Sequence, residues 1–315
     1  MKRLKLEAES NISTSSYTKI KASKKDLKDY AWAYFMIAPT IIGLIILNVW
    51  PIIQTFWLSL HKTGDFGLNE FVGFDNYKQL FQDKIVIQAI ANTFMYSIVS
   101  VPIGIILSLL IAVLINSHIK GKSLYRTIYF LPMVSAPAAI AMVWRWMYNG
   151  EFGLFNYLLS LIGVKGINWL TDPKFSLVSV IIVGIWSTLG YNMVILLAGL
   201  QEIPGTFYEA AEIDGAGSVR QFFTITLPLV SPTMFFVVIT TIIGSLQVFD
   251  HIFMMIDKTN IALEKTQSLV YLFYKYSFVM YDKGYGSTIV MFLLAVILII
   301  TVIQLYLQKK WVHYQ

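Results

Sequence analysis

The chain has 315 residues, of which 57% are hydrophobic and 13% charged, and its mean hydropathy is +0.65. Soluble domains carry about 25% charged residues, so this composition argues against an ordinary soluble protein and predicts a membrane protein. The formal net charge is +6. There is no cysteine, which excludes a disulfide scaffold and thiolate metal sites, and we expect no metal site of any kind.

The chain begins with a polar, basic segment, residues 1–30. It contains no short apolar core followed by a small-residue cleavage site, so it is not typical of a signal peptide. We expect a partly disordered tail. Because lysine and arginine next to a first span are retained in the cytoplasm, the many basic residues of this tail place it inside the cell.

Residues 31–315 are predicted to form one transmembrane domain. A spanning helix needs about 20 mostly apolar residues, and four runs are that long without a charged residue in their middle. They are residues 31–60, 85–117, 175–200 and 284–308. Two shorter runs, 127–144 and 232–249, have proline, glycine or aromatic residues at their edges and fit two further spans. The sequence therefore predicts an all-α polytopic membrane protein with six transmembrane helices and both termini in the cytoplasm.

This topology also accounts for the distribution of charge. With the tail inside, the excess of basic residues falls on the cytoplasmic segments that flank the spans. A basic protein could instead bind nucleic acid, but no nucleic-acid-binding module is recognisable, so we expect none as a partner. The predicted outer loops hold Trp144, Trp146, Tyr148 and Trp169, whose amphipathic rings favour a membrane interface.

A polar segment, residues 201–232, interrupts the apolar sequence between the fourth and fifth spans and is predicted to be cytoplasmic. A helix is expected from about residue 206 to 213, and Gly215 permits a turn after it. Ser218 is expected to cap a second short helix that Pro228 limits. Helices this short are unstable alone in water, so the segment needs a partner protein.

The same segment contains a spaced pattern: Glu-Ala-Ala, three residues, Gly, nine residues, Ile, one residue, Leu-Pro. It resembles the EAA motif of the membrane subunits of binding-protein-dependent ABC importers. The resemblance implies a cytoplasmic coupling helix that fits a cleft on an ATPase subunit, with Glu209 placed to pair with a basic residue there. The coupling residues it implies are Glu209, Ala210, Ala211, Asp214, Gly215, Ile225, Leu227 and Pro228.

Other stretches are similar to the carbohydrate-uptake branch of that family, whose best-known member is the maltose importer. They include "YFLPMVSAPAAIAMVWRWMYNGEFGLFN", "NMVILLAGLQEIP" and "WPIIQTFWLS". The resemblance implies an oligosaccharide substrate and a location in the prokaryotic plasma or inner membrane. It further implies three kinds of protein partner: a homologous second permease, two cytoplasmic ATPase subunits and an extracellular solute-binding protein.

The chain itself is not expected to hydrolyse ATP. A Walker loop needs a glycine, four residues, and then Gly-Lys-Ser or Gly-Lys-Thr. Gly121, Lys122 and Ser123 are present, but Asn116 stands where the first glycine is required. We therefore expect that this subunit is not an enzyme, that it binds no cofactor, and that ATP and Mg²⁺ bind to the separate ATPase chains.

Polar residues gather at one depth of two neighbouring spans. Polar groups in the bilayer interior are costly and usually face protein or a water-filled path. Hydroxyl, amide and aromatic groups together suit a sugar, although they could equally join helices. The predicted pathway residues are Thr188, Tyr191 and Asn192 in the fourth span and Thr241, Ser245 and Gln247 in the fifth.

Alignment with the maltose subunit places its sugar-contacting positions near these residues, but Val248 stands where an amide is expected.

Three alternatives to oligosaccharide import stay open. Close relatives in the family carry glycerol-3-phosphate or a related phosphodiester, which would favour a cation, and no lysine or arginine lies deep in a span. An ion-driven secondary transporter would favour a buried carboxylate, which is also missing, or internal repeats. A membrane scaffold would not need the polar residues at all.

Overall fold

The computed structural model describes residues 24–64, 69–117 and 120–312. Most of the predicted tail, residues 1–23, lies outside this range. The chain divides into two units, Met1–Gln54 and Thr55–Gln315. Helix α2 (Lys24–Leu44) of the first unit continues through a π-helical turn (Ile45–Val49) into α3 (Trp50–Ser59), which crosses the boundary between the units. Residues Lys28–Ser59 form a continuous apolar helix long enough to cross a membrane.

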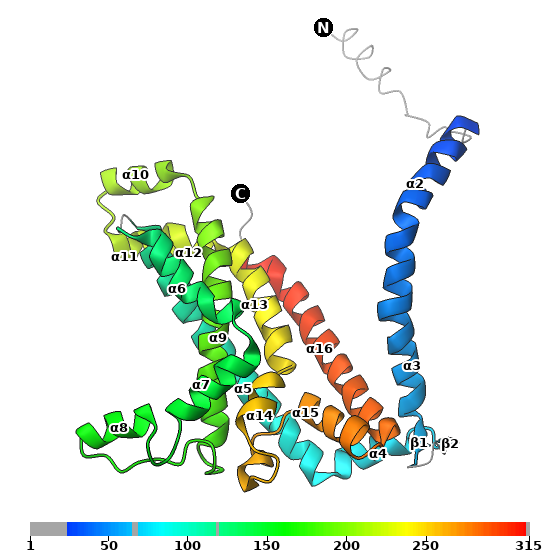
Figure 1. Cartoon of the computed structure of the whole chain (residues 1–315). Helices are drawn as coiled ribbons and strands as arrows, with labels where there is room; N and C mark the ends of the chain where they lie inside the picture. The colour runs from blue at the N-terminus through cyan, green and yellow to red at the C-terminus, as the bar shows by residue number, and fades with distance from the viewer. Residues whose placement is uncertain (1–23, 65–68, 118–119, 313–315) are drawn as a thin grey trace, which may run out of the picture. The chain divides into compact units, whose positions relative to one another are not determined.

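The second unit contains three more helices of membrane-spanning length: α5 (Lys84–Asn116), α9 (Ser176–Gln201) and α16 (Lys283–Trp311) (Figure 1). Two bent helix pairs also pass the same criteria. They are α6 (Lys122–Val134) with α7 (Pro137–Met147), and the helical run Ser218–Leu229 with α13 (Ser231–Leu246). Counting each pair as one span gives six in the described residues, which agrees with the predicted all-α polytopic fold.

The two bent pairs lie where the sequence predicts the two shorter spans. The bends are 100° between α6 and α7 and 68° before α13. Each lies just ahead of a proline in the first turn of the next helix, Pro137 and Pro232. A proline removes a backbone donor, and it disfavours helical geometry in the residue before it; Ala136 is extended, with ψ 132°. The span predicted over residues 127–144 is therefore made of two helices, α6 and α7, with a break between them.

The remaining elements are short; those within the run Ser218–Leu229 belong to the second bent pair, and the others lie between the spans. Residues His61–Thr63 (β1) and Asn69–Phe71 (β2) pair antiparallel, with His61 opposite Phe71. The short helices are α4 (Asp75–Gln82), α8 (Leu154–Leu161), α10 (Gly205–Ile213), α11 (Ser218–Gln221), α12 (Leu227–Leu229), α14 (Asp250–Met255) and α15 (Leu269–Tyr274). Two π-helical turns, Phe222–Thr226 and Lys275–Val279, and a 3₁₀ turn, Ile261–Leu263, complete them.

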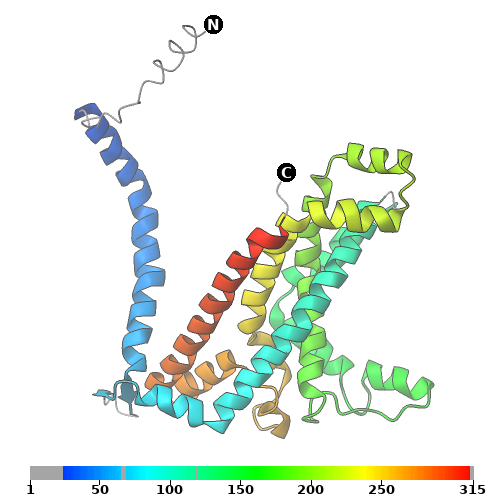
Figure 2. The same cartoon turned by 180° about the vertical axis from the view of Figure 1, so that it is seen from behind.

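Helix α9 is the centre of the second unit and packs against α5, α6 and α13. Figure 2 shows α5 running obliquely across it. Three glycines of α9 permit these close approaches. A Cβ atom at Gly190 would lie 1.9 Å from the Tyr129 carbonyl oxygen of α6, and one at Gly199 would lie 2.4 Å from the Thr233 hydroxyl of α13. At Gly184 it would meet the Tyr96 ring of α5.

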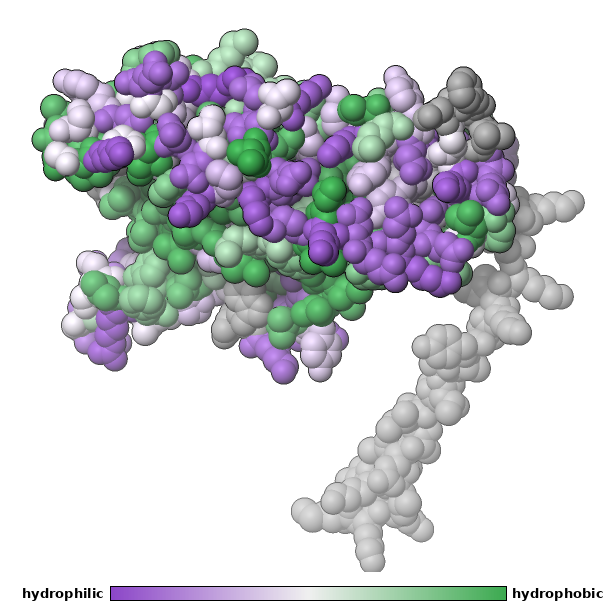
Figure 3. Space-filling view, turned by 90° about the horizontal axis from the view of Figure 1, so that it is seen from below, coloured by the Kyte–Doolittle hydropathy of each residue, from purple (hydrophilic) through white to green (hydrophobic). Residues whose placement is uncertain are grey.

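The short elements separate to the two ends of this unit. Helices α10 and α11 lie at one end together with the C-terminal end of α16, and α4, α8 and α14 lie toward the other (Figures 1 and 2). Hydrophilic residues cover much of the face seen from the second end (Figure 3). We call the end with α10 and α11 the loop end, and the end with α4, α8 and α14 the opposite end.

Candidate functional site

A cavity of about 250 Å³ lies between α5, α9, α13 and α14. Each predicted pathway residue lines it: Thr188, Tyr191, Asn192, Thr241, Ser245 and Gln247. Sequence reasoning did not select Tyr96 and Ser100, which α5 adds to the wall. Asp250, His251 and Val248 line it as well. The spacing of polar residues on α9 and α13 thus predicted residues that line one cavity. It did not predict the contribution of α5.

Several of the cavity's polar side chains are already bonded to the backbone of their own helices. The Thr188 hydroxyl donates to the Gly184 carbonyl at 3.0 Å, and the Gln247 amide donates to the Ile243 carbonyl at 3.2 Å. Such bonds satisfy the groups inside a membrane while leaving their remaining acceptor or donor capacity for a ligand.

Ser245 also joins two helices. Its Oγ lies 2.7 Å from Oγ of Ser97 on α5, and it donates to the Ile242 carbonyl at 2.8 Å. For this residue the alternative interpretation, a bond between helices, therefore holds, although Ser245 also faces the cavity. Holding α13 against α5 fixes two walls of the cavity relative to each other.

Asn192 is a cavity residue with unused hydrogen-bonding capacity. Its side chain is buried, and Oδ1 accepts a bond from the Thr241 hydroxyl at 3.3 Å. Its Nδ2 has no hydrogen-bond partner among the described residues. A buried donor left unpaired costs about 1–3 kcal/mol, so a donor in this position is unfavourable unless an acceptor arrives. Asn192 is thus a residue of the cavity lining whose buried amide has donor capacity to spare.

The charges of the cavity are few. Its lining residues include one carboxylate, Asp250, and one imidazole, His251, and neither lysine nor arginine is among them. His251 lies on α14, beyond the spanning helix α13, and its Nε2 is 3.1 Å from the Ser187 hydroxyl. Burial lowers the pKa of His251, and Asp250 opposes this only partly. The imidazole is therefore protonated less readily than a free one.

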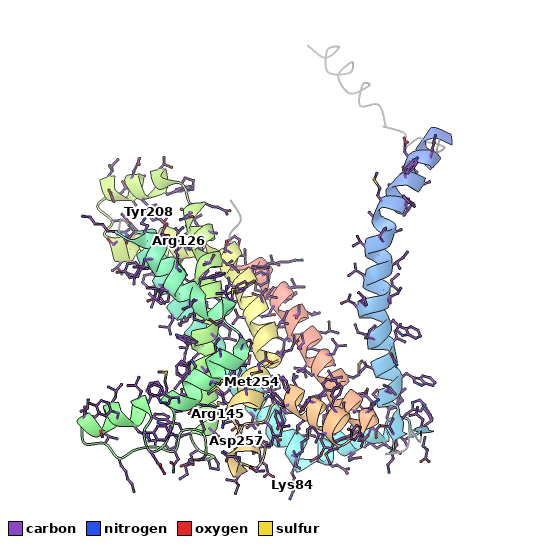
Figure 4. All side chains as sticks on the ribbon, in the orientation of Figure 1. Lys84, Arg126, Arg145, Tyr208, Met254 and Asp257 are labelled. Atoms are coloured by element: carbon purple, nitrogen blue, oxygen red, sulfur yellow. The ribbon has the colours of Figure 1, made fainter. Side chains whose placement is uncertain are left out.

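The arginine of the predicted outer loops is already paired. Arg145, on α7, contacts both carboxylate oxygens of Asp257 at 3.0 and 3.2 Å, and it donates to the Met254 carbonyl at 3.4 Å (Figure 4). This ion pair is partly exposed at the opposite end of the unit, outside the lining of the cavity. It joins α7 to the segment after α14.

The loop end carries the EAA segment, whose turn forms as expected. Gly215 has φ +76°, and its amide donates to the Glu212 carbonyl at 3.0 Å. The Ala216 amide donates to the Ala211 carbonyl at 2.8 Å. These two bonds form a Schellman motif, in which a left-handed glycine ends the helix. The predicted helix before the turn is α10.

One detail of the second helix differs from expectation. Ser218 does not cap α11: it is the first helical residue, and the cap position is Gly217, which makes no side-chain cap bond. The Gly217 backbone is extended, with ψ 165°, so the chain enters the helix one residue earlier than predicted. The run ends at Leu229, one residue past Pro228, near the predicted limit.

The motif residues divide into an exposed half and a packed half. Glu209, Ala210, Asp214 and Gly215 are exposed, and Ala211 is half-buried. Ile225 and Leu227 instead pack against a core cluster that includes Leu200 and Val230. Exposed apolar side chains surround the acidic residues: Phe207, Ile213, Val219 and Phe223, with Ile213 87% exposed.

Comparison with known proteins identifies the family. Residues 82–313 match the family described as "Binding-protein-dependent transport system inner membrane component". The chain is 32% identical to the sn-glycerol-3-phosphate transport system permease protein UgpA of Pectobacterium atrosepticum, with 90% of this chain and 95% of that protein aligned. It is 34% identical to the trehalose/maltose transport system permease protein MalF of Thermococcus litoralis, over the same shares.

A solved structure supports the same assignment. The chain matches a subunit of a bacterial alginate ABC transporter, solved in complex with an alginate pentasaccharide-bound periplasmic protein. The TM-score is 0.81 at 26% identity, covering 91% of this chain and 96% of the other. The resemblance found in the EAA motif is therefore confirmed. The chain belongs to the family of binding-protein-dependent transport system inner membrane components, as an ABC importer permease subunit.

Proposed function

We propose that this subunit imports a neutral oligosaccharide that an extracellular solute-binding protein delivers, and that it is driven through its EAA segment by cytoplasmic ATPase subunits. A homologous second permease completes the membrane part. The loop end then faces the cytoplasm, together with both termini, and the opposite end receives the binding protein.

The residues that line the cavity support the choice of substrate. Its wall combines hydroxyls, the Tyr96 and Tyr191 rings and the unpaired Asn192 amide, without lysine or arginine. Sugar hydroxyls both donate and accept, and a sugar ring stacks on aromatic faces, so this lining suits a neutral sugar. An anionic ligand would meet the Asp250 carboxylate and no cation from this subunit.

The observation that carries the choice of driving partner is the EAA segment. Its acidic and apolar side chains are exposed on a short helix, α10, in which no residue is buried. Exposed apolar residues next to charged ones are typical of a protein interface. Glu209 is then free to pair with a basic residue of an ATPase subunit. ATP and Mg²⁺ bind to that subunit, and this chain remains without catalytic activity.

A second candidate substrate is glycerol-3-phosphate or a related phosphodiester. The similarity to UgpA favours it. It requires that the second permease supply the cation that this cavity lacks. An ion-driven secondary transporter is a weaker candidate, because it leaves the EAA segment unused.

Reconstituted complexes test both parts of the proposal. The chain, its companion permease, the ATPases and the binding protein are placed in proteoliposomes, and ATP hydrolysis is measured with neutral oligosaccharides or with sn-glycerol-3-phosphate. We expect stimulation by a neutral oligosaccharide and its loss in Glu209→Lys. Stimulation by glycerol-3-phosphate alone would overturn the substrate. Intact stimulation in Glu209→Lys would overturn the coupling role, and uptake without nucleotide would favour an ion-driven mechanism.

A further inference from the structure

The EAA segment consists of two arms. The first is α10, and the second, which we call the second arm, is the run of α11, the π-helical turn Phe222–Thr226 and α12. They are joined by the turn at Gly215. The Gln221 side chain supports that turn by donating to the Ala216 carbonyl at 3.0 Å.

A hydrogen bond between side chains ties the arms together at their far ends. The hydroxyls of Tyr208 on α10 and Thr226 on the second arm lie 3.0 Å apart. Thr226 is buried, whereas no residue of α10 is. Tyr208 lies at the loop end of the molecule (Figure 4). Its ring packs against the core cluster that Ile225 and Leu227 also contact.

Apolar side chains of both arms, among them Tyr208 and Phe222, pack against one core cluster, but a space remains between the arms. A cavity of about 500 Å³ lies there, lined by residues of both arms and of the ends of α5 and α9; Tyr208, Glu212, Gln221 and Thr226 belong to its wall. A Cβ atom added at Gly205 or Gly217, which begin the two arms, would have no neighbouring atom within 4 Å, so these glycines do not hold the arms in place. Among the described residues, the bond between Tyr208 and Thr226 is the side-chain hydrogen bond that joins the two arms directly.

The second arm continues directly toward the substrate cavity. It holds a π-helical turn, a feature that is frequent at functional positions in helices. After Leu229 the chain bends into α13, which carries Thr241 and Ser245. A displacement of α10 can reach α13 as a rigid movement only if the two arms move together.

We infer that Tyr208 is a positioning residue for coupling: its bond to Thr226 makes α10 and the second arm one rigid body, which passes the movement of α10 to α13. This inference rests on the proposed coupling function. Neither residue belongs to the exposed half of the motif, so the tie acts inside the subunit, behind the surface that meets the ATPase.

Spin labels can test the tie directly, because the chain has no cysteine that would compete for the label. Labels at Thr206→Cys and Arg220→Cys, both exposed, report the separation of the arms in the assembled transporter. Tyr208→Phe and Thr226→Val each remove a hydroxyl and keep the shape of the side chain. Loss of one hydrogen bond should raise the population of separated arms by roughly threefold to tenfold and broaden the distance distribution.

A second label pair tests transmission to the cavity. Labels at Phe236→Cys on α13 and Leu161→Cys on α8, both exposed, should change their distance when ATP and vanadate trap the ATPases. In Tyr208→Phe we expect most of this change to be lost while ATP hydrolysis continues. Thr226 Oγ1 also donates to the Gln221 carbonyl at 3.5 Å, so the double variant Tyr208→Phe with Thr226→Val should be no worse than Thr226→Val alone, which already lacks the bond to Tyr208.

Matched controls separate the tie from general damage. Thr224→Val removes a hydroxyl two residues away that bonds within its own helical run, to the Arg220 carbonyl at 2.7 Å. Tyr157→Phe removes a hydroxyl from an exposed ring on α8. Both should leave the two distances unchanged. Unchanged distances in Tyr208→Phe, or equal effects in the controls, would overturn the inference even if Glu209→Lys abolishes coupling.

Broadened arm distances with an intact change at α13 would overturn the inference in another way, because the tie would then serve folding alone. The proposed coupling function itself fails separately, if ATP and vanadate move neither label pair in the chain without further substitutions. In that case Tyr208 has no movement to transmit, and the inference falls with it.

Discussion

The cavity between α5, α9, α13 and α14 differs from the EAA segment in how its polar side chains are satisfied. In the cavity, Asn192 and Ser245 are buried while Thr188 and Gln247 are exposed, and all four are bonded to the backbone of their own helix or to a neighbouring helix. In the first arm of the EAA segment no residue is buried, and Glu209 and Glu212 are exposed. The polar groups of the cavity thus find partners within the subunit, whereas α10 presents its acidic side chains at the surface.

This difference indicates where substitutions should act. Substitutions at the glycines of α9 should disturb folding, because the neighbouring helices leave no room there for an added Cβ atom. Changes on α10 should leave the subunit folded and affect only its assembly and coupling. Variants in both regions, measured for stability and for coupling, test this difference.

Gly190→Ala should have the largest effect. The added Cβ atom would meet the Tyr129 carbonyl oxygen at 1.9 Å, so α6 and α9 must move apart. Overpacking of this kind costs about 1–3 kcal/mol or more. We expect a lower thermal midpoint in detergent and less folded protein. Gly244→Ala, with no atom within 4 Å of the new Cβ, is the matched control; an equal loss there would show that the contact at Gly190 is unimportant.

Gly215→Ala should act on the other region. For alanine, the left-handed conformation that Gly215 adopts at φ +76° costs about 1–2 kcal/mol. The end of α10 should loosen, and ATP hydrolysis stimulated by the binding protein should fall while the thermal midpoint of the subunit changes little. Gly217→Ala, at φ −69°, should be nearly neutral. A drop in thermal midpoint as large as that of Gly190→Ala would contradict the expected difference between the two regions.

Asn192→Leu should separate binding from folding inside the cavity. Because Nδ2 has no partner among the described residues, its removal breaks only the weak contact of Oδ1 with Thr241, at 3.3 Å. We expect the KM for uptake to rise by up to about tenfold, the value of one hydrogen bond, with little loss of stability. Ser245→Ala, which also breaks a bond between helices, should lower the thermal midpoint more. The reverse order would mean that Asn192 serves packing.

The smallest expected effect is on the pH dependence of the subunit's stability. The pKa of His251 is lowered below its ordinary value of 6.5, mainly by burial. The unfolded chain therefore binds a proton more readily than the folded one, so stability is complete above about pH 6.5 and declines as the pH falls below it. His251→Gln should flatten the change in thermal midpoint between about pH 7.5 and about pH 5.5, roughly one pH unit on either side of the ordinary pKa. An unchanged slope would assign the pH dependence to other groups.

Much of the fold and the cavity followed from simple periodicity. Thr188, Tyr191 and Asn192 recur at helical spacing, and the middle of an apolar run sets its depth, so one face and one depth were predictable. Tyr96 and Ser100 were not, because α5 has polar residues along its whole length, among them Asn92 and Ser108. Which of its faces meets α9 depends on contacts such as the one at Gly184, and these are tertiary.

The local details that the sequence did not predict had a common cause. The break before Pro137 and the cap at Gly217 each depend on the conformation of a single residue, Ala136 or Gly217, and composition over a window of about 20 residues does not resolve it. The turn at Gly215 was predictable because a glycine directly after a short helical stretch is a strong signal on its own.

The broken span of α6 and α7 also constrains how the chain is made. With 13 and 11 residues, neither half is long enough to cross the bilayer alone, since about 20 are needed. The partner that α6 packs against is α9, whose Gly190 touches the backbone of Tyr129. That helix leaves the ribosome later than α6 and α7, so the third span can reach its final position only after the fourth has been synthesised.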